Sequence, residues 1–342
     1  MTAETVDHTV RLHAKLSASR VPRVALCAGS LLAEDALPQE PSGEAAAKGT
    51  AIHELAERIL TGQPISDDAP ADLVEVAQKY AHVVTEQTKG AKKHFVELDV
   101  TEALKTIHPW LGGTADYVAV GGGVLTVVDL KTGRNEVGPE WNPQLLTYAL
   151  GAAVALKAPD SVKVRLAIFQ PDCGGWKEFW CAYPDLMDWR DSLLGVANRA
   201  MQANAPRTPT PEACKYCRAR VHCTELQEQV KEQAKQDHAI EGQAVTMEML
   251  DAAELCTIWA DSVKEAAKRQ LIDKPNSISG WKMREGRKMV KWKDSKMAAA
   301  LLVSHPEAFE LKSVSAVQKL GLEVPASLID ETRTAASLVR AK

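Results

Sequence analysis

The chain has 342 residues, of which 45% are hydrophobic and 25% charged, and this composition is typical of a globular protein with one large or two modest domains. No apolar run approaches the roughly 18 residues of a membrane span, and the first 20 residues lack the apolar core of a signal peptide, so we expect a cytoplasmic protein without a membrane partner. The formal net charge of −4 excludes a globally basic nucleic-acid binder, so any contact with phosphates would need local basic patches and metal ions.

The first predicted elements are helices. After a loose arm over residues 1–20, we expect a short helix over 30–37. Longer helices over 45–60 and 71–88 are predicted because their apolar residues recur at helical spacing. Strands follow over 94–100, 114–120 and 124–130, and a triplet of glycines between the last two favours a hairpin.

The second half of the predicted fold again contains both helices and strands. Asn142 and Pro143 are favoured residues for the start of a helix, which we expect to continue to residue 156. Strands over 162–170 and 176–183 and a helix over 184–203 complete a mixed central sheet flanked by helices, an α/β or α+β fold.

The last third of the chain has a different character. Charged helices are predicted over 224–238 and 247–272, followed by a basic hairpin over 279–292. We therefore expect a first domain over 1–230, closed by a cysteine cluster, and a C-terminal helical and hairpin region over 231–342.

Two acids and a lysine stand out on the predicted hairpin. Asp116 lies near the start of one strand, and Asp129 and Lys131 lie two residues apart at the end of the next, where they share a face. Carboxylates suit Mg²⁺ or Mn²⁺, and a neighbouring amine can assist deprotonation of a water or stabilise phosphoryl oxygens. The pattern favours a phosphodiester-cleaving enzyme. The alternative is an ordinary hairpin with surface charges, against which the apolar run before Asp129 argues.

These residues, with a Gln-x-x-x-Tyr pattern after them, resemble the RecB-type branch of the PD-(D/E)XK nucleases, which have a restriction-endonuclease-like core. The resemblance implies that Asp116 and Asp129 bind the catalytic metal and that Lys131 belongs to the signature of the family. It also implies that Gln144 and Tyr148, one helical turn apart, lie beside the active site and orient the scissile strand.

The same resemblance implies further metal ligands. His53, on the helix predicted over 45–60, matches a ligand histidine of the branch, and the carbonyl of Leu130 completes the metal shell. Glu97, on the preceding strand, is an additional candidate. The alternatives are an ordinary helical histidine and a surface acid.

A cysteine cluster follows the predicted sheet. Cys214, Cys217 and Cys223 fall within ten residues, a spacing that brings thiolates to one metal, and the fourth ligand is either His222 or Cys27. Cys27 resembles the early cysteine of iron-staple nucleases, of the AddB and CRISPR-adaptation types. That likeness implies a structural [4Fe–4S] cluster that ties the ends of the nuclease domain together. Bound Zn²⁺, or no metal, are the alternatives.

The basic hairpin interleaves aromatic and cationic residues, which could stack on bases and follow phosphates. The candidate DNA-binding residues are Trp281, Lys282, Arg284, Arg287, Lys288, Lys291 and Trp292. The alternative is a solvated hairpin whose tryptophans pack on neighbouring helices. The whole chain resembles a phage-type group of RecB-like proteins that carry a similar Gly-Trp-Lys hairpin after the cysteines.

The sequence as a whole thus predicts a Mg²⁺- or Mn²⁺-dependent DNA nuclease, specifically an exonuclease of phage or bacterial recombination and repair. DNA is the expected partner, together with a recombination or annealing protein. A phage-encoded chain would act in the cytoplasm of its host. Two other hypotheses stay open: a non-catalytic DNA-binding or assembly module that keeps the nuclease fold, and a zinc-binding interaction protein.

Overall fold

The computed structural model describes residues 14–38, 43–235 and 244–283. The chain divides into two compact units, Met1–Trp281 and Lys282–Lys342, and nearly all the described residues belong to the first. Most of the predicted basic hairpin, from residue 284 onward, lies outside the described residues. The expected domain boundary at residue 230 stays a prediction.

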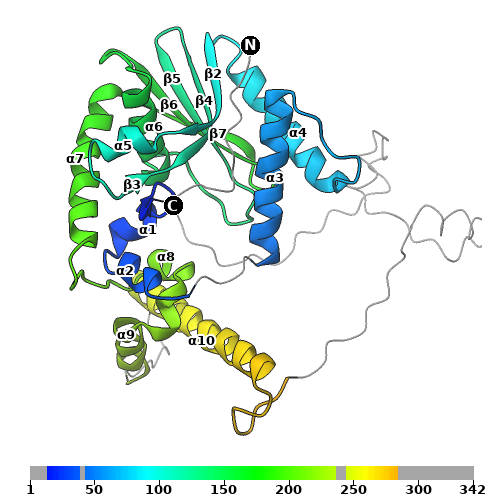
Figure 1. The fold of residues 1–342 in the computed structure, drawn as a ribbon. Coiled ribbons are helices and arrows are strands. Elements are labelled where there is room, and N and C mark those ends of the chain that lie inside the picture. The colour runs from blue at the N-terminus through cyan, green and yellow to red at the C-terminus, as the bar shows by residue number, and fades with distance from the viewer. Residues whose placement is uncertain (1–13, 39–42, 236–243, 284–342) are drawn as a thin grey trace, which may run out of the picture. The chain divides into compact units, whose positions relative to one another are not determined.

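A mixed sheet of five strands forms the centre of the described part, in the order β2-β4-β5-β6-β7 (Figure 1). β5 and β6 are parallel and every other neighbouring pair is antiparallel. The strands are β2 (Lys93–Asp99), β4 (Thr114–Gly121), β5 (Val124–Leu130), β6 (Lys163–Gln170) and β7 (Gly175–Ala182). All five match the strands predicted from alternating or continuous apolar runs, and the predicted mixed α/β class is confirmed.

Helices cover both faces of this sheet because strands β4, β5 and β6 carry apolar side chains on both sides. One face packs against α3 (Glu44–Thr61) and α4 (Ala71–Gln87). The other packs against a larger group of helices, which Figure 1 shows on the opposite side of the sheet. These are α1 (Val21–Leu26), α5 (Thr101–Lys105), α6 (Pro143–Ala155) and α7 (Tyr183–Ala200).

The helix that connects the two parallel strands begins and ends where the sequence predicts. The Asn142 side chain accepts hydrogen bonds from the backbone N–H groups of Gln144 and Leu145, at 3.0 and 3.2 Å, and Pro143 occupies the first helical position. Nearly every residue of α6 is buried, so this helix fixes its first turn firmly against the end of β5.

The segment before residue 20 corrects one expectation. It was predicted as a loose arm, yet β1 (Leu16–Ser17) pairs in parallel with β3 (Leu111–Gly112), and Leu16 is fully buried. The first helix, α1, starts at Val21, earlier than the predicted helix that corresponds to α2 (Ser30–Asp35). Two-residue strands and six-residue helices are too short for hydrophobic periodicity to reveal.

Four helices follow the sheet and α7 in the described part of the chain and pack on one another. They are α8 (Pro211–Lys215), the 3₁₀ helix η2 (Arg218–His222), α9 (Thr224–Lys235) and α10 (Met247–Asp273). The N-terminal helices reach them directly, because α1 contacts α8 and α2 contacts η2. Within the described residues, no helix combines the length and apolar character that crossing a membrane requires.

Candidate metal centre and its neighbouring network

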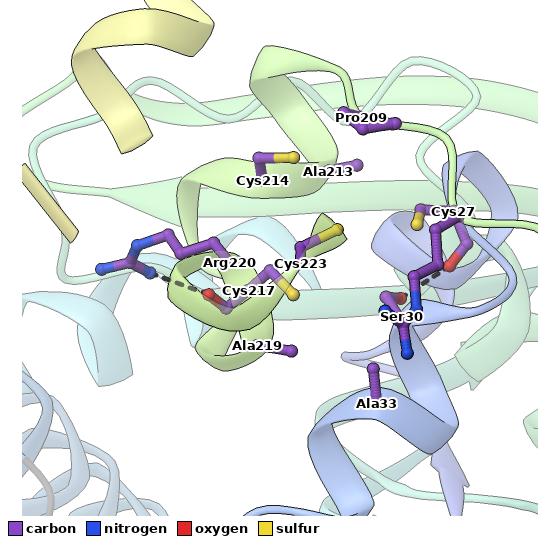
Figure 2. A pocket seen from close by; sticks show the side chains of 11 residues that line it. Cys27, Ser30, Ala33, Pro209, Ala213, Cys214, Cys217, Ala219, Arg220 and Cys223 are labelled. Carbon is purple, nitrogen blue, oxygen red and sulfur yellow. Dashed lines mark hydrogen bonds between the residues drawn. The ribbon is translucent and has the colours of Figure 1, made fainter. Parts of the chain in front are cut away.

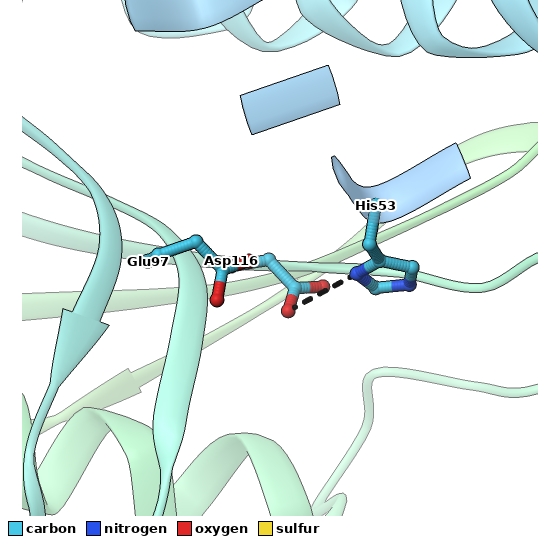
Figure 3. A group of neighbouring side chains, drawn as sticks. All are labelled: His53, Glu97 and Asp116. Atoms are coloured by element: carbon cyan, nitrogen blue, oxygen red, sulfur yellow. Dashed lines mark ion pairs between the residues drawn. The ribbon is translucent and has the colours of Figure 1, made fainter. Parts of the chain in front are cut away.

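Three side chains from three different elements form a candidate metal centre. His53 on α3, Glu97 on β2 and Asp116 on β4 each offer a ligand atom, and these atoms all lie within 4.8 Å of one another (Figure 3). His53 Nδ1 is 3.5 Å from Asp116 Oδ1. Two carboxylates and an imidazole are a donor set that divalent cations accept, so this group can hold a metal ion.

The sheet explains why the two carboxylates meet. Strands β2 and β4 pair Val96 with Tyr117 and Leu98 with Ala115, which leaves Glu97 and Asp116 facing each other at the position between. Glu97 has a φ of 52°, a left-handed conformation that a residue with a side chain rarely adopts. Such local strain concentrates at functional sites, where the surrounding structure holds it in place.

Glycines in the predicted motifs allow close approaches around this centre. A Cβ atom on Gly49, on the helix that carries His53, would lie 3.0 Å from the hydroxyl of Thr132, just after β5. A Cβ atom on Gly113 would lie 3.1 Å from the ring of Tyr148. A larger residue at either position would require the Thr132 hydroxyl or the Tyr148 ring to move by a few tenths of an ångström.

A buried polar network lies beside the metal centre and contains the other predicted site residues. Asp129 is 3% exposed, and its Oδ2 atom is 2.7 Å from Lys131 Nζ. The Gln144 amide donates to Asp129 Oδ1 at 3.0 Å and to the Tyr148 hydroxyl at 3.2 Å. Lys131 Nζ in turn donates to Gln144 Oε1 at 2.9 Å. Gln144 therefore holds the acid and the lysine in a fixed relation.

One backbone hydrogen bond joins the network to the metal centre. The N–H of Leu130, between Asp129 and Lys131, donates to Asp116 Oδ2 at 2.7 Å. Leu130 thus lies next to the metal centre, where its carbonyl was predicted to be a ligand, while its side chain packs in the core. The structure brings together six of the predicted site residues, with Glu97 beside them: His53, Asp116, Asp129, Lys131, Gln144 and Tyr148.

The electrostatics of the site favour a bound cation. Burial lowers the pKa of His53, but the Asp116, Asp129 and Glu97 carboxylates together outweigh this effect and the pKa rises to about 9. Burial raises the pKa of Asp129, an effect that Lys131 opposes and Asp116 reinforces. Asp116 contributes to the rise of both pKa values, so several carboxylates share a partly desolvated place where a divalent cation would balance their charge.

The cysteines form a second cluster at the base of the fold. Cys27, Cys214, Cys217 and Cys223 line one cavity, and none of them is in a disulfide. Figure 2 shows the sulfur of Cys27 facing the other three across a gap. His222, the other candidate for the fourth ligand, lines a neighbouring pocket instead. Burial raises the pKa of the Cys214 thiol to about 12, and the three other cysteines add to this rise.

Two contacts near the site have no signal in the sequence. The fully buried Gln170 side chain, at the end of β6, binds three backbone groups of the loop after Lys131. Farther along this loop, the Asn135 amide donates to the Tyr216 hydroxyl at 2.6 Å, within the Cys214–Cys217 turn. Neither residue belongs to a motif, because a single polar residue at a strand end or in a turn is common.

Few of the predicted DNA-binding residues of the basic hairpin can be located. Trp281 is 69% exposed, and Lys282 is exposed beside it. Arg284, Arg287, Lys288, Lys291 and Trp292 lie outside the described residues, so their role stays a prediction.

Fold and site together define a mixed α/β protein with a His/Glu/Asp group able to hold a metal. The chain belongs to the family described as Protein of unknown function (DUF2800), whose model matches residues 13–321. No curated protein matches it. Among solved structures, one titled "Crystal structure of SSO0001" is similar at 15% identity, with a TM-score of 0.31, over 64% of this chain and 89% of that chain.

Proposed function

We propose that this protein is a Mg²⁺- or Mn²⁺-dependent nuclease that hydrolyses phosphodiester bonds in DNA. The observation that carries the proposal is the hydrogen bond from the Leu130 N–H to Asp116, which couples two chemically different groups. One is a set of metal-ligand atoms within 4.8 Å, and the other is a buried acid paired with a lysine. Either group alone has ordinary structural explanations, whereas a nuclease needs both side by side.

The donor set fits the proposed metals. His53, Glu97 and Asp116 would hold a metal ion, and Asp129 would extend the site across the neighbouring strand. Carboxylate oxygens are preferred by Mg²⁺ and Mn²⁺, and the excess negative charge is what a divalent cation would balance. When bound, the metal would supply Lewis acidity toward the phosphate and its attacking water.

The remaining side chains have roles that follow from their contacts. Lys131 is the positive charge of the network and would donate hydrogen bonds to phosphoryl oxygens as their charge grows. Gln144 uses its amide on Asp129 and Lys131, so it would act as a positioning residue. Tyr148 accepts a hydrogen bond from Gln144, and burial raises its pKa, which keeps its hydroxyl neutral. These contacts support positioning of the acid and the lysine rather than direct contact of Gln144 and Tyr148 with DNA.

The cysteine cavity fits a [4Fe–4S] cluster as the second cofactor of the proposal. Four thiols of one cavity supply the complete ligand set of such a cluster, with no need for a histidine. The backbone N–H of Thr208 donates to Cys27 Sγ at 3.3 Å, a contact that would stabilise a thiolate there. The Arg207 and Arg220 side chains also line the cavity and would offset the charge of the thiolates. Bound Zn²⁺ remains the competing assignment.

The test is cleavage of end-labelled DNA, single- and double-stranded, linear and circular, in Mn²⁺ and in EDTA. Activity on linear DNA alone would support the exonuclease of recombination and repair that the RecB-like resemblance implies. We expect Asp129→Asn and Lys131→Met each to lower the rate by about 10²- to 10³-fold. Asp72→Asn and Lys79→Met, both on the exposed face of α4, are the matched controls.

Three outcomes separate the hypotheses. Metal-dependent cleavage that the two site variants abolish supports the nuclease. DNA binding without cleavage in any metal would instead favour a non-catalytic DNA-binding or assembly module. About four iron atoms per chain after anaerobic purification support the cluster, and one zinc ion per chain would overturn it.

A further inference from the structure

Left-handed backbone conformations at residues other than glycine point to a second functional position. Among the described residues they occur at Glu97, Trp141, Lys157 and Asn276. Lys157 follows the C-cap of α6, where the N–H of Ala158 binds the carbonyl of Ala153 at 2.9 Å, so it is an ordinary helix end. Asparagine tolerates the conformation well. The two cases without a local explanation are Glu97, in the metal centre, and Trp141.

Trp141 is unusual in a second respect, because its large apolar side chain is 52% exposed. The exposed ring is nevertheless fixed. It packs edge-on against Phe179, with 4.9 Å between ring centroids and 60° between ring planes. The loop around it is also held, since the Asn142 side chain donates to the carbonyl of Gly138 at 2.9 Å and caps α6. The protein thus keeps an aromatic ring at its surface on a residue whose backbone is strained and whose side chain is held in place.

The position of Trp141 relates the ring to the site. Trp141 comes three residues before Gln144, so their Cα atoms are at most about 11 Å apart. Gln144 binds both Asp129 and Lys131. Trp141 therefore ends the loop that leads from Lys131 to α6, and its ring rests on β7, at the edge of the sheet opposite β2.

We propose that Trp141 is a stacking platform for an unpaired nucleobase of the bound strand, on the β7 side of the scissile phosphate. The inference rests on the proposed nuclease function and specifies its substrate as single-stranded DNA or a frayed DNA end. A base inside a duplex is already stacked on its neighbours, whereas an unpaired base presents a free face to an aromatic ring. Because Phe179 and the capped loop fix the ring in advance, stacking costs little conformational freedom.

The test uses the full-length protein, with Ca²⁺ in place of Mn²⁺ so that binding is measured without turnover. The probe is a single-stranded oligonucleotide with 2-aminopurine at successive positions, whose fluorescence falls when the base stacks on an aromatic ring. Trp141→Gly is the main variant, because glycine adopts a positive φ without strain. Trp141→Phe keeps a smaller ring. Trp180→Ala is the matched control, since Trp180 is 46% exposed on β7 and packs against Arg165.

We expect Trp141→Gly to weaken oligonucleotide binding about tenfold or more and to abolish quenching at one position of the strand. Trp141→Phe should recover part of both, and Trp180→Ala should match the wild type. The melting temperature of Trp141→Gly should not fall, because the variant removes backbone strain along with the ring.

Two results would overturn the proposal and are distinct from each other. If the wild-type protein binds and cleaves DNA and Trp141→Gly does so equally well, the stacking role is wrong and the nuclease stands. The exposed ring would then serve another contact, such as a protein partner. If the wild-type protein neither binds nor cleaves DNA in any metal, both proposals fail.

Discussion

Gln170 allows the most direct test of how the loop beside the candidate site is held. Its side chain is fully buried, and its amide nitrogen donates to the carbonyls of Gly133 and Asn135 at 2.6 and 2.8 Å. Its amide oxygen accepts from the N–H of Val137 at 3.0 Å. The same oxygen accepts from Lys177 Nζ at 3.4 Å. The substitution Gln170→Met keeps the length and volume of the side chain and removes all four hydrogen bonds.

The expected loss follows from the number and burial of these bonds. A typical intramolecular hydrogen bond contributes about 1 kcal/mol net, and a buried group left without its partner costs about 1–3 kcal/mol. The loop carbonyls lie on exposed residues, where water replaces part of what is lost. We therefore expect Gln170→Met to lower the free energy of unfolding by about 2–3 kcal/mol, which for a chain of this size corresponds to a fall of about 3–6 °C in melting temperature.

Thermal unfolding followed by circular dichroism measures this loss, with Gln202→Leu at an exposed position as the control. Limited trypsin digestion adds a local measurement, because Arg134 is exposed on the same loop. The chain should be cut after Arg134 faster in Gln170→Met than in the wild type. An unchanged melting temperature together with unchanged cutting would refute the idea that Gln170 holds the loop.

Three further predictions concern the rest of the molecule. Glu34→Gln should lower the free energy of unfolding by about 2–3 kcal/mol in chemical denaturation. The reason is that the buried carboxylate binds Arg20, Arg23 and the N–H of Arg218. A loss below about 0.5 kcal/mol would contradict this. Tyr80→Phe should raise the free energy of unfolding by about 1 kcal/mol, because the buried Tyr80 hydroxyl has no hydrogen-bond partner among the described residues. A clear destabilisation would show that the hydroxyl has one. Cys27→Ser should reduce the metal content of anaerobically purified protein. Cys173→Ser, in a turn away from the cavity, is the control and should leave the metal content unchanged. Equal metal content in the two variants would remove Cys27 from the ligand set.

The sheet and the acidic motif could be predicted because their signals are local. Each central strand is an apolar run, and Asp129 and Lys131 share a face through simple alternation. The convergence of His53 with them could not be derived from spacing and came only from resemblance to a family. The left-handed conformation of Glu97 was also hidden, because the sheet and its surroundings impose it rather than the residue type.

The elements that sequence reasoning missed are short and depend on distant partners. β1 and β3 have two residues each and exist only because they pair across more than ninety positions of the chain. The fourth residue of the cysteine cavity likewise depends on distant packing. Cys27, rather than His222, faces Cys214, Cys217 and Cys223 because of how α1 and α2 pack against α8 and η2. No periodicity within a window of 11–18 residues contains that information.

The docking of the N-terminal helices on the cysteine segment has a consequence for how the chain is made. The N–H of Arg218 binds the Glu34 carboxylate across 184 positions, and the N–H of Gly29 binds the carbonyl of Pro206. At synthesis rates of roughly 5–20 residues per second, α2 waits on the order of 10–40 s for these partners. His53, Asp116 and Asp129 have all left the ribosome before then. Assembly of the acidic centre can therefore precede closure of the cysteine cavity, and the nascent chain carries an apolar N-terminal segment without its partner during that interval.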